Sequence, residues 1–535
     1  MTTGGHKERA LRKSRPVRRG SRGSQAALSS TVAHPDPELQ TTAAVGNGEA
    51  MLPPLRLIST LCQQLQAAGI SYCHWKSTEG LPRSSRGEND LDLLVARGDI
   101  SRFIEVLQGL GFKEGRLPAR KEHAGITNYF GLDEGSGRLV HVHAHYQLVL
   151  GDDMTKNYRL PVEEPYLSSA VQGSLFREPS REFEFIVLAI RMILKHGTWD
   201  AILGFRGALS PSERSELAYL STANDAEIRR LLSEHLPYIG VDLFDRCVRS
   251  LQPRCPLGFR LRVGHQVERS LSAHARRPPT IDRTLKLWRR ACGKLRRILA
   301  RPPVRARLST GGALVAVVGG DGAGKTTVVK DLALWLSRYF LIERVHLGKP
   351  PASPKRLAVK GLMALQRLPR RPPRFLSERS AELEAPDSLG YTRQLRHVLT
   401  ARDRYRAYVR SRRLAANGWI VVCDRYPLDK IKLMDGPQLA SIGRSSGLGR
   451  VQRRLADLER RYYQHIAPPD ILLVLRVGPD IAAQRRPEED PEVVRARCRE
   501  VWDLDWDPVQ ASVIDATLPK AQVLSDAKSL VWSSL

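Results

Sequence analysis

The chain alternates between short apolar runs and longer stretches with helical spacing. Continuous apolar runs at 313–318, 420–423 and 471–475 are typical of buried parallel strands. Residues 55–68 instead place apolar side chains at helical spacing, and residues 183–194 predict a buried helix. The pattern therefore predicts an α/β fold with a parallel sheet. At 535 residues the chain is long enough for two or three domains.

The pattern divides the chain into five segments. They are a disordered basic tail over 1–50, an α+β domain over 51–165, a helical region over 166–280, a basic amphipathic helix and linker over 281–311, and an α/β domain over 312–535. In the fourth segment Leu285, Trp288, Cys292, Leu295 and Leu299 form an apolar stripe beside Lys and Arg. This stripe could pack against a flanking domain or lie on an anionic membrane.

The charge of the chain indicates which partners it could bind, but says nothing about its fold. The 85 Lys and Arg residues exceed the 56 Asp and Glu residues and give a formal net charge of +29. This balance favours a phosphorylated ligand, a polyanion or an anionic membrane surface, although a solvated basic surface explains it equally well. The oligomeric state stays open, a homodimer included.

The seven cysteines are scattered, without disulfide-like or zinc-like spacing, which favours a reducing cytoplasm. No uninterrupted apolar segment reaches the roughly 20 residues that span a bilayer. We therefore expect a cytoplasmic protein, with peripheral membrane contact left open.

The strongest motif follows the apolar run 313–318 and precedes a helical pattern. Its residues are Gly319, Gly320, Asp321, Gly322, Ala323, Gly324, Lys325, Thr326 and Thr327. The spacing G-x-x-x-x-G-K-[ST] between a strand and a helix is that of a P-loop, whose backbone N–H groups surround phosphates. Lys325 would reach the β- and γ-phosphates and Thr326 would ligate Mg²⁺. The sequence thus predicts binding of ATP with Mg²⁺.

Three further motifs follow the P-loop in order. They are Asp403-Arg404 in a helical pattern, Asp424-Arg425-Tyr426 at the end of the second apolar run, and an arginine-bearing segment near Arg485. With the P-loop they resemble the thymidylate kinase family over roughly residues 312–535. The resemblance implies a three-layer α/β/α P-loop fold and transfer of the ATP γ-phosphate to a nucleoside monophosphate or related phosphorylated acceptor.

The resemblance also implies roles for individual residues. Asp321 would face the acceptor's sugar, Arg404 and Arg425 would hold its phosphate beside Tyr426, Asp424 would lie near Mg²⁺, and Ala516 and Thr517 would lie against adenine. Because the variable P-loop positions carry no basic residue, we expect the catalytic arginine in the lid, as Arg485 or Arg486. Arg495, Arg497 and Arg499, farther along the chain, are reserve candidates for this role.

Two stretches depart from that family. Residues 345–351 replace its Arg-Glu-Pro-Gly-Gly segment, and residues 427–430 replace the part that helps to hold the base. The acceptor is therefore open. A nucleotide-gated regulatory ATPase that binds a polyanion or membrane remains an alternative to the kinase.

The α+β segment carries a second candidate site. Asp90 and Asp92 share one face of a strand, and the alternating stretch 138–145 puts His141, His143 and His145 on one face. With the Lys76-Ser77 turn this resembles the nucleotidyltransferase superfamily over about residues 55–150. The corresponding candidate site is Lys76, Ser77, Asp90, Asp92, His141 and His143. It departs from the superfamily at two places, because Lys76 stands where a glycine is expected and the later strand offers histidines in place of a third carboxylate.

Four interpretations of this second site stay open. The aspartates and histidines could hold a metal ion, or Asp90 and Asp92 could be two solvated aspartates at a strand end. The third is a bifunctional protein of nucleotide-sugar or polysaccharide metabolism, with an active amino-terminal nucleotidyltransferase. The fourth is a binding or regulatory domain built on the same fold.

Overall fold

The computed structural model describes most of the chain beyond the basic tail. The described residues are 53–76, 80–199, 209–299, 304–366, 387–428, 430–431, 436–439 and 449–535. The predictions for the tail at 1–50 and for Ser77 lie outside the described residues.

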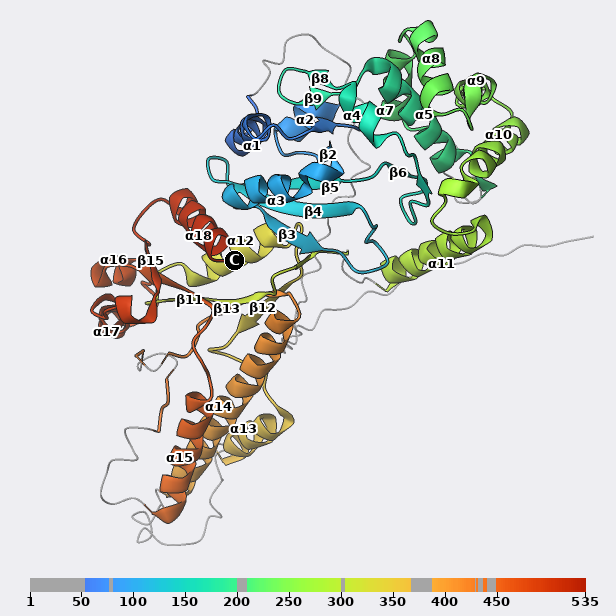
Figure 1. The fold of residues 1–535 in the computed structure, drawn as a ribbon. Helices are drawn as coiled ribbons and strands as arrows, with labels where there is room; N and C mark the ends of the chain where they lie inside the picture. Colours follow the sequence, from blue (N-terminus) through green and yellow to red (C-terminus); the bar gives the residue numbers. More distant parts are fainter. Residues whose placement is uncertain are drawn as a thin grey trace, which may run out of the picture. The chain divides into compact units, whose positions relative to one another are not determined.

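The amino-terminal part is built on a mixed six-stranded sheet (Figure 1). In spatial order its strands are β1 (Tyr72–His74), β2 (Leu91–Val95), β5 (Arg138–His145), β4 (Ile126–Asp133), β3 (Lys113–Arg116) and β10 (Arg307–Leu308). Only β2 and β5 are parallel, and the other neighbours are antiparallel. The parallel pair matters most, because it carries the aspartates and histidines of the second candidate site.

Two helices cover one face of this sheet. They are α1 (Arg56–Ala67), which is the helix predicted over 55–68, and α3 (Ile100–Gly109). Their buried side chains, among them Leu61 and Phe103, pack against Leu93 and Val142 of the parallel pair. Shorter elements complete this part: α2 (Leu81–Ser85), α4 (Glu163–Ser168), the hairpins β6 (Val149–Leu150) with β7 (Tyr158–Arg159) and β8 (Val171–Gln172) with β9 (Arg177–Glu178), and a 3₁₀ turn at Arg97–Asp99.

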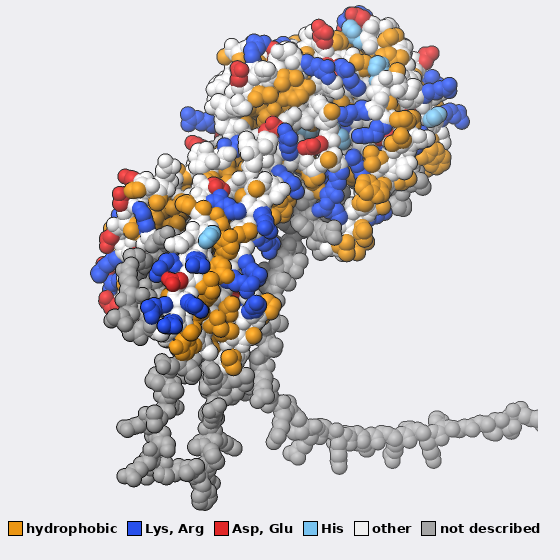
Figure 2. Space-filling view, turned by 60° about the horizontal axis from the view of Figure 1, so that its bottom comes forward, with side chains coloured by type: hydrophobic (Ala, Val, Ile, Leu, Met, Phe, Trp, Pro, Cys, Tyr) orange, Lys and Arg blue, Asp and Glu red, His pale blue; other side chains and the backbone are white. Residues whose placement is uncertain are grey.

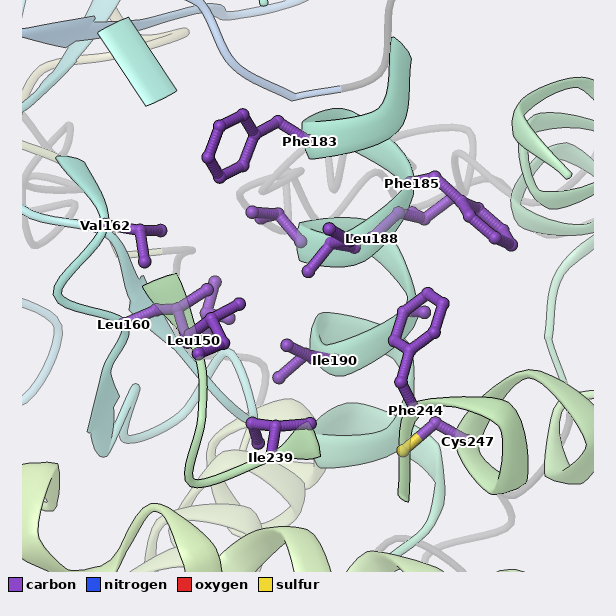
Figure 3. Packing of buried hydrophobic residues seen from close by; sticks show 14 of the residues in the cluster. Leu150, Leu160, Val162, Phe183, Phe185, Leu188, Ile190, Ile239, Phe244 and Cys247 are labelled. Atoms are coloured by element: carbon purple, nitrogen blue, oxygen red, sulfur yellow. The ribbon is translucent and has the colours of Figure 1, made fainter. Parts of the chain in front are cut away.

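A helical cluster surrounds α5 (Arg181–His196), the buried helix predicted from residues 183–194. Figure 3 shows Leu188 and Ile190 facing Leu150, while Phe185 lies beside Phe244 on the other side. The Ser180 hydroxyl accepts from the Phe183 N–H and caps the helix. The surrounding helices are α7 (Pro211–Leu220), α8 (Asp225–His235), α9 (Gly240–Ser250) and α10 (Leu257–Ser270), followed by a 3₁₀ turn at Ser272–His274.

The amphipathic helix α11 (Pro279–Ile298) turns its basic side toward the protein. Arg283 pairs with Glu268 at 2.7 Å and Arg290 with Asp152 at 2.5 Å. Part of its apolar stripe is exposed, since Trp288 is 59% and Leu295 56% exposed, whereas Leu285 and Cys292 are half-buried. Both arrangements that the sequence left open, packing against a flanking domain and contact with an anionic membrane, stay predictions.

The carboxy-terminal part contains a fully parallel five-stranded sheet. Its spatial order is β12 (Ile342–His346), β13 (Ile420–Asp424), β11 (Ala313–Gly319), β14 (Ile471–Arg476) and β15 (Ser512–Asp515). The three predicted apolar runs are the three central strands, and the prediction of an α/β fold with a parallel sheet is confirmed.

Helices lie on both faces of this sheet, since successive residues of β11 point to opposite sides. Val315 and Val317 pack in a cluster with Leu332 of α12 (Lys325–Leu336), whereas Ala316 packs in a cluster with Tyr408 of α14 (Asp387–Ala416). The other helices are α13 (Pro354–Gln366), α15 (Arg450–Gln464), α16 (Pro479–Gln484), α17 (Pro491–Trp502) and α18 (Lys520–Ser534), with a 3₁₀ turn at Asp507–Val509. In the part of the chain that the structure describes, no helix has the length and apolar character to cross a bilayer.

Candidate nucleotide-binding site

The P-loop connects β11 to α12 through a backbone that needs glycine. Gly324 precedes the helix with φ +84°, in the left-handed region. A Cβ on Gly319 would lie 2.6 Å from the Leu475 carbonyl oxygen of β14, and a Cβ on Gly320 would lie 2.4 Å from the Cys498 sulfur. Only glycine therefore lets the loop approach its neighbours this closely. The helix that follows directs its amino-terminal N–H groups toward the loop.

The P-loop lysine lies inside the loop. Lys325 is buried, and its Nζ donates to the carbonyl oxygens of Gly319 at 3.0 Å and Gly320 at 2.7 Å. Its Nζ also lies 3.9 Å from Asp321 Oδ1. The ammonium group is thus held among the loop carbonyls, close to where the motif would place phosphates.

Thr326 and Asp424 meet beside the loop because β11 and β13 are parallel neighbours. Their register pairs Val317 with Asp424, which brings this carboxylate to the carboxyl end of the sheet. Thr326 Oγ1 donates to Asp424 Oδ2 at 3.0 Å. The other oxygen, Oδ1, is buried and has no hydrogen-bond partner within the described residues. A buried carboxylate oxygen without a partner is suited to a cation.

Three cationic side chains surround Asp321, which is almost fully buried. Arg497 Nη1 donates to Oδ2 at 2.8 Å and Arg425 Nη2 donates to Oδ1 at 3.1 Å, with Lys325 close by. Burial alone would raise the pKa of Asp321, but the hydrogen bond from Arg497 and the neighbouring positive charges lower it below its usual value. Asp321 is thus in contact with cationic side chains from three places in the chain: the start of α12, the end of β13 and α17.

Two features of the arginines could not be taken from the motifs. Arg425 has φ +57°, an unusual backbone conformation for a residue other than glycine and one that clusters at functional sites. Arg497 was a reserve candidate for the catalytic arginine and not one of the two first choices. Its spacing from the buried Val494 and Cys498 places it on the inner side of α17, and this spacing was the available signal.

The remaining predicted acceptor residues support the loops around the site. Arg404 is buried and donates to the carbonyl oxygens of Leu347 at 2.7 Å and Gly348 at 3.0 Å, and it also contacts the Tyr463 hydroxyl. Tyr426 is buried in the core, and its hydroxyl donates to the Ala467 carbonyl. Their predicted contacts with an acceptor stay predictions.

The two lid arginines occupy different surroundings. Arg485 follows α16, and its Nη1 donates to the Ala516 carbonyl at 3.0 Å and contacts the Gly322 carbonyl at 3.4 Å. It thus links the P-loop to the segment predicted to lie against adenine. Arg486 is half-buried and pairs with Glu488 at 3.0 Å.

The segment after β15 is held by its own hydrogen bonds. The Ala516 N–H donates to the Arg476 carbonyl at 2.8 Å. The Thr517 hydroxyl donates to Asp515 Oδ1 at 2.6 Å. The predicted role of Ala516 and Thr517 beside adenine stays a prediction.

The second candidate site lies on β2 and β5 of the mixed sheet. His141 Nδ1 contacts Asp90 at 2.7 Å, His143 Nδ1 contacts Asp92 at 2.9 Å, and Lys76 Nζ pairs with Asp92 Oδ2 at 3.0 Å. His145 Nε2 also reaches Asp92, at 3.3 Å, although the predicted candidate site had not included His145.

Burial and charge set the protonation of this second cluster. Burial alone would raise the pKa of Asp92, but Lys76 and the hydrogen bonds from His143 and His145 lower it well below its usual value. Burial lowers the pKa of both His143 and His145. The cluster therefore contains an ionised carboxylate next to neutral imidazoles.

Comparison with known proteins places the chain among ATP-binding proteins. No protein-family model matches it. It is 31% identical over 228 residues, 41% of this chain and 86% of the relative, to the protein named "Uncharacterized ATP-binding protein YghR" of Escherichia coli strain K12. The chain belongs to the YghR family. The protein named "Uncharacterized ATP-binding protein YghS" of the same strain is 24% identical over 228 residues, 42% of this chain and 93% of that relative.

A thymidylate kinase is similar to a smaller share of the chain. The enzyme from Chromohalobacter salexigens is 31% identical over 179 residues, which are 34% of this chain and 70% of the enzyme. The YghR family, this enzyme and the P-loop geometry agree on a P-loop nucleotide-binding domain with an α/β fold.

Proposed function

We propose that the chain is an ATP- and Mg²⁺-dependent phosphotransferase resembling thymidylate kinase, which transfers the γ-phosphate of ATP to a nucleoside monophosphate or a related phosphorylated acceptor. The observation that carries this proposal is the convergence of Lys325, Arg425 and Arg497 on Asp321 beside the P-loop. Phosphoryl transfer needs positioned positive charge on both the donor and the acceptor phosphates. Three cations at one loop support such a site.

ATP would bind with its phosphates along the P-loop. The N–H groups of the loop and of the first turn of α12 would donate to phosphate oxygens, and Lys325 would extend toward the β- and γ-phosphates. The names of YghR and YghS support ATP as the nucleotide.

Thr326 and Asp424 would hold Mg²⁺. The partnerless Oδ1 of Asp424 and the Thr326 hydroxyl supply the hard oxygen donors that this ion prefers. When bound, Mg²⁺ neutralises charge on the transferred phosphate. Asp424 Oδ2 would accept the hydrogen bond of the Thr326 hydroxyl and so keep that hydroxyl oriented toward the site.

The acceptor phosphate would lie near Arg425 and Arg497, with Arg404 and Tyr426 as further predicted contacts. Because Arg425 and Arg497 already meet at Asp321, this carboxylate would orient them before the acceptor binds. In the lid, Arg485 is the better placed of the two predicted catalytic arginines, since it contacts the P-loop carbonyl of Gly322.

An assay of ADP release with ATP and Mg²⁺ tests this function. Nucleoside monophosphates and sugar phosphates are each added as acceptors, beside a reaction without acceptor. We expect release that requires one acceptor and is lost in Lys325→Ala. The matched control is Lys330→Ala, an exposed lysine on the same helix, which should behave as wild type. Release at one rate with and without every acceptor would contradict the proposal.

The partly exposed apolar stripe of α11 supports a second candidate, an ATPase whose nucleotide state regulates binding to an anionic membrane. Trp288 and Leu295 are each more than half exposed, and Figure 2 shows Lys and Arg spread over the visible face. Sedimentation of the full chain with phosphatidylserine vesicles tests it, with and without ATP. Binding lost in a Trp288→Ser, Leu295→Ser variant would support this candidate, and equal sedimentation of variant and wild type would dismiss it.

A further inference from the structure

Three polar side chains that the P-loop site does not include converge on one face of the mixed sheet. Asp92 lies on β2, and His143 and His145 lie two residues apart on β5, so both histidines share a face. The parallel pairing of the two strands sets Asp92 directly beside His143. The backbone alone therefore brings one carboxylate and two imidazoles together.

The separations of the three donor atoms match the edges of a metal coordination sphere. Asp92 Oδ1 lies 2.9 Å from His143 Nδ1 and 3.3 Å from His145 Nε2, and the two ring nitrogens are 3.3 Å apart. An ion about 1 Å out of the plane of these three atoms would lie about 2.1 Å from each, the usual distance from zinc to imidazole nitrogen and carboxylate oxygen. We infer that Asp92, His143 and His145 bind one divalent transition-metal ion of the Zn²⁺ and Co²⁺ type.

The donor types select the class of ion. Mg²⁺ and Ca²⁺ prefer oxygen ligands, whereas two imidazole nitrogens with one carboxylate suit Zn²⁺, Co²⁺, Mn²⁺ or Fe²⁺. The inferred site thus differs from a pair of carboxylates holding Mg²⁺, because His143 and His145 supply two of the three donors.

The neighbouring side chains hold the donors in place. Lys76 Nζ binds the second oxygen of Asp92, which leaves Oδ1 directed at the histidines. The Trp75 ring packs edge-on against His145 with 4.7 Å between ring centroids. Contacts of this kind fix the orientation of ligands before an ion arrives. The His143 side chain is partly exposed, so solvent reaches this donor.

His141 belongs to a separate pair on the same strand. Its Nδ1 contacts Asp90 at 2.7 Å and its Nε2 contacts Asn128 at 3.0 Å, so both ring nitrogens already have partners. It therefore serves as a matched control: a histidine on the same strand and face that lies outside the inferred donor set.

Metal titration of the full chain, freed of any histidine tag and of bound metal, tests the inference. Zn²⁺ binding is measured by calorimetry, and Co²⁺ binding by its visible absorption. We expect one ion per chain in the wild type and in His141→Gln, and an affinity at least tenfold weaker in His143→Gln and Asp92→Asn.

Two outcomes would overturn the inference: no stoichiometric binding by the wild type, or unchanged affinity in His143→Gln. An equal loss in His141→Gln would overturn the donor set. Circular dichroism of each metal-free variant checks folding. If Asp92→Asn does not fold, the metal affinity of His143→Gln still tests the inference, because His143 is partly exposed and its substitution disturbs the core less. The measurement does not depend on phosphotransfer, so the inference and the proposed kinase can fail separately.

Discussion

Asp321→Asn tests the charge balance of the nucleotide site. The substitution keeps the shape of the side chain and removes a negative charge that Arg497 approaches at 2.8 Å, Arg425 at 3.1 Å and Lys325 at 3.9 Å. Arg497 keeps a second, more distant acidic partner, Glu489 at 3.7 Å. Three positive groups would then lie around a neutral amide. We expect the folded protein to lose stability and the site to become more attractive to phosphate.

The size of the expected loss in stability depends on how deeply Asp321 and its partners are buried. Breaking a fully buried ion pair costs about 3–5 kcal/mol, whereas an exposed pair contributes about 0–1 kcal/mol. Asp321 is buried, but the side chains of Arg425 and Arg497 are 28% and 34% exposed, so water screens part of the repulsion. We therefore expect a loss of about 2 kcal/mol in the free energy of unfolding.

Urea unfolding measures this loss. The unfolding transition of the nucleotide-binding domain is recognised because added ATP moves its midpoint to a higher urea concentration. The control is Asp331→Asn on α12, the helix that follows the P-loop. Asp331 pairs with the exposed Lys520 at 3.8 Å, so its substitution should change stability by less than about 0.5 kcal/mol. ATP should also stabilise Asp321→Asn more than it stabilises the wild type, since its phosphates replace the missing charge. Equal unfolding midpoints for the two variants would refute this reasoning.

Three further substitutions test other parts of the account. Asp424→Asn should lower the rate of ADP release at least about 100-fold while leaving Mg²⁺-free ATP binding unchanged, because it removes a proposed metal ligand; calorimetry with and without Mg²⁺ separates the two effects. Gly320→Ala would put its Cβ 2.4 Å from the Cys498 sulfur and should cost about 1–3 kcal/mol in urea unfolding, with partial recovery when Cys498→Ala is added. Leu188→Ala leaves a cavity in the helical cluster of Figure 3 and should cost about 2–5 kcal/mol; a wild-type midpoint would show that α5 is not part of a packed core.

The parallel sheet could be predicted from the sequence because its central strands are buried on both faces. Such strands need continuous apolar runs, and 313–318, 420–423 and 471–475 became β11, β13 and β14. The spatial order of the five strands could not be predicted, since it depends on which chain segments pack together and not on any local pattern.

The candidate site was predictable only where a motif fixes the backbone. The P-loop spacing identified Lys325 and Thr326 because that loop requires glycine at set positions. Arg497 was only a reserve candidate, because it is one of several arginines in α17 and its contact with the distant Asp321 depends on how that helix packs. His145 was likewise placed on the right face, but its approach to Asp92 depends on the pairing of strands far apart in the sequence.

Helix α11 shows the same limit. Its amphipathic pattern predicted a helix, but not which side faces the protein. The partners that decide this, Glu268 and Asp152, lie outside the helix, and Asp152 is far away in the sequence. The periodicity of the sequence distinguishes the two faces of the helix. Ion pairs with residues outside the helix decide which face packs against the protein.

The most direct test of the central claim follows the phosphate itself. The full chain is given ATP with a radioactive γ-phosphate, Mg²⁺ and the acceptor that supports ADP release, and the products are separated by chromatography. The account predicts that the label appears on the acceptor as a new diphosphate, and that this product is absent with Lys325→Ala. Label found only as free inorganic phosphate, at one rate with and without acceptor, would contradict it.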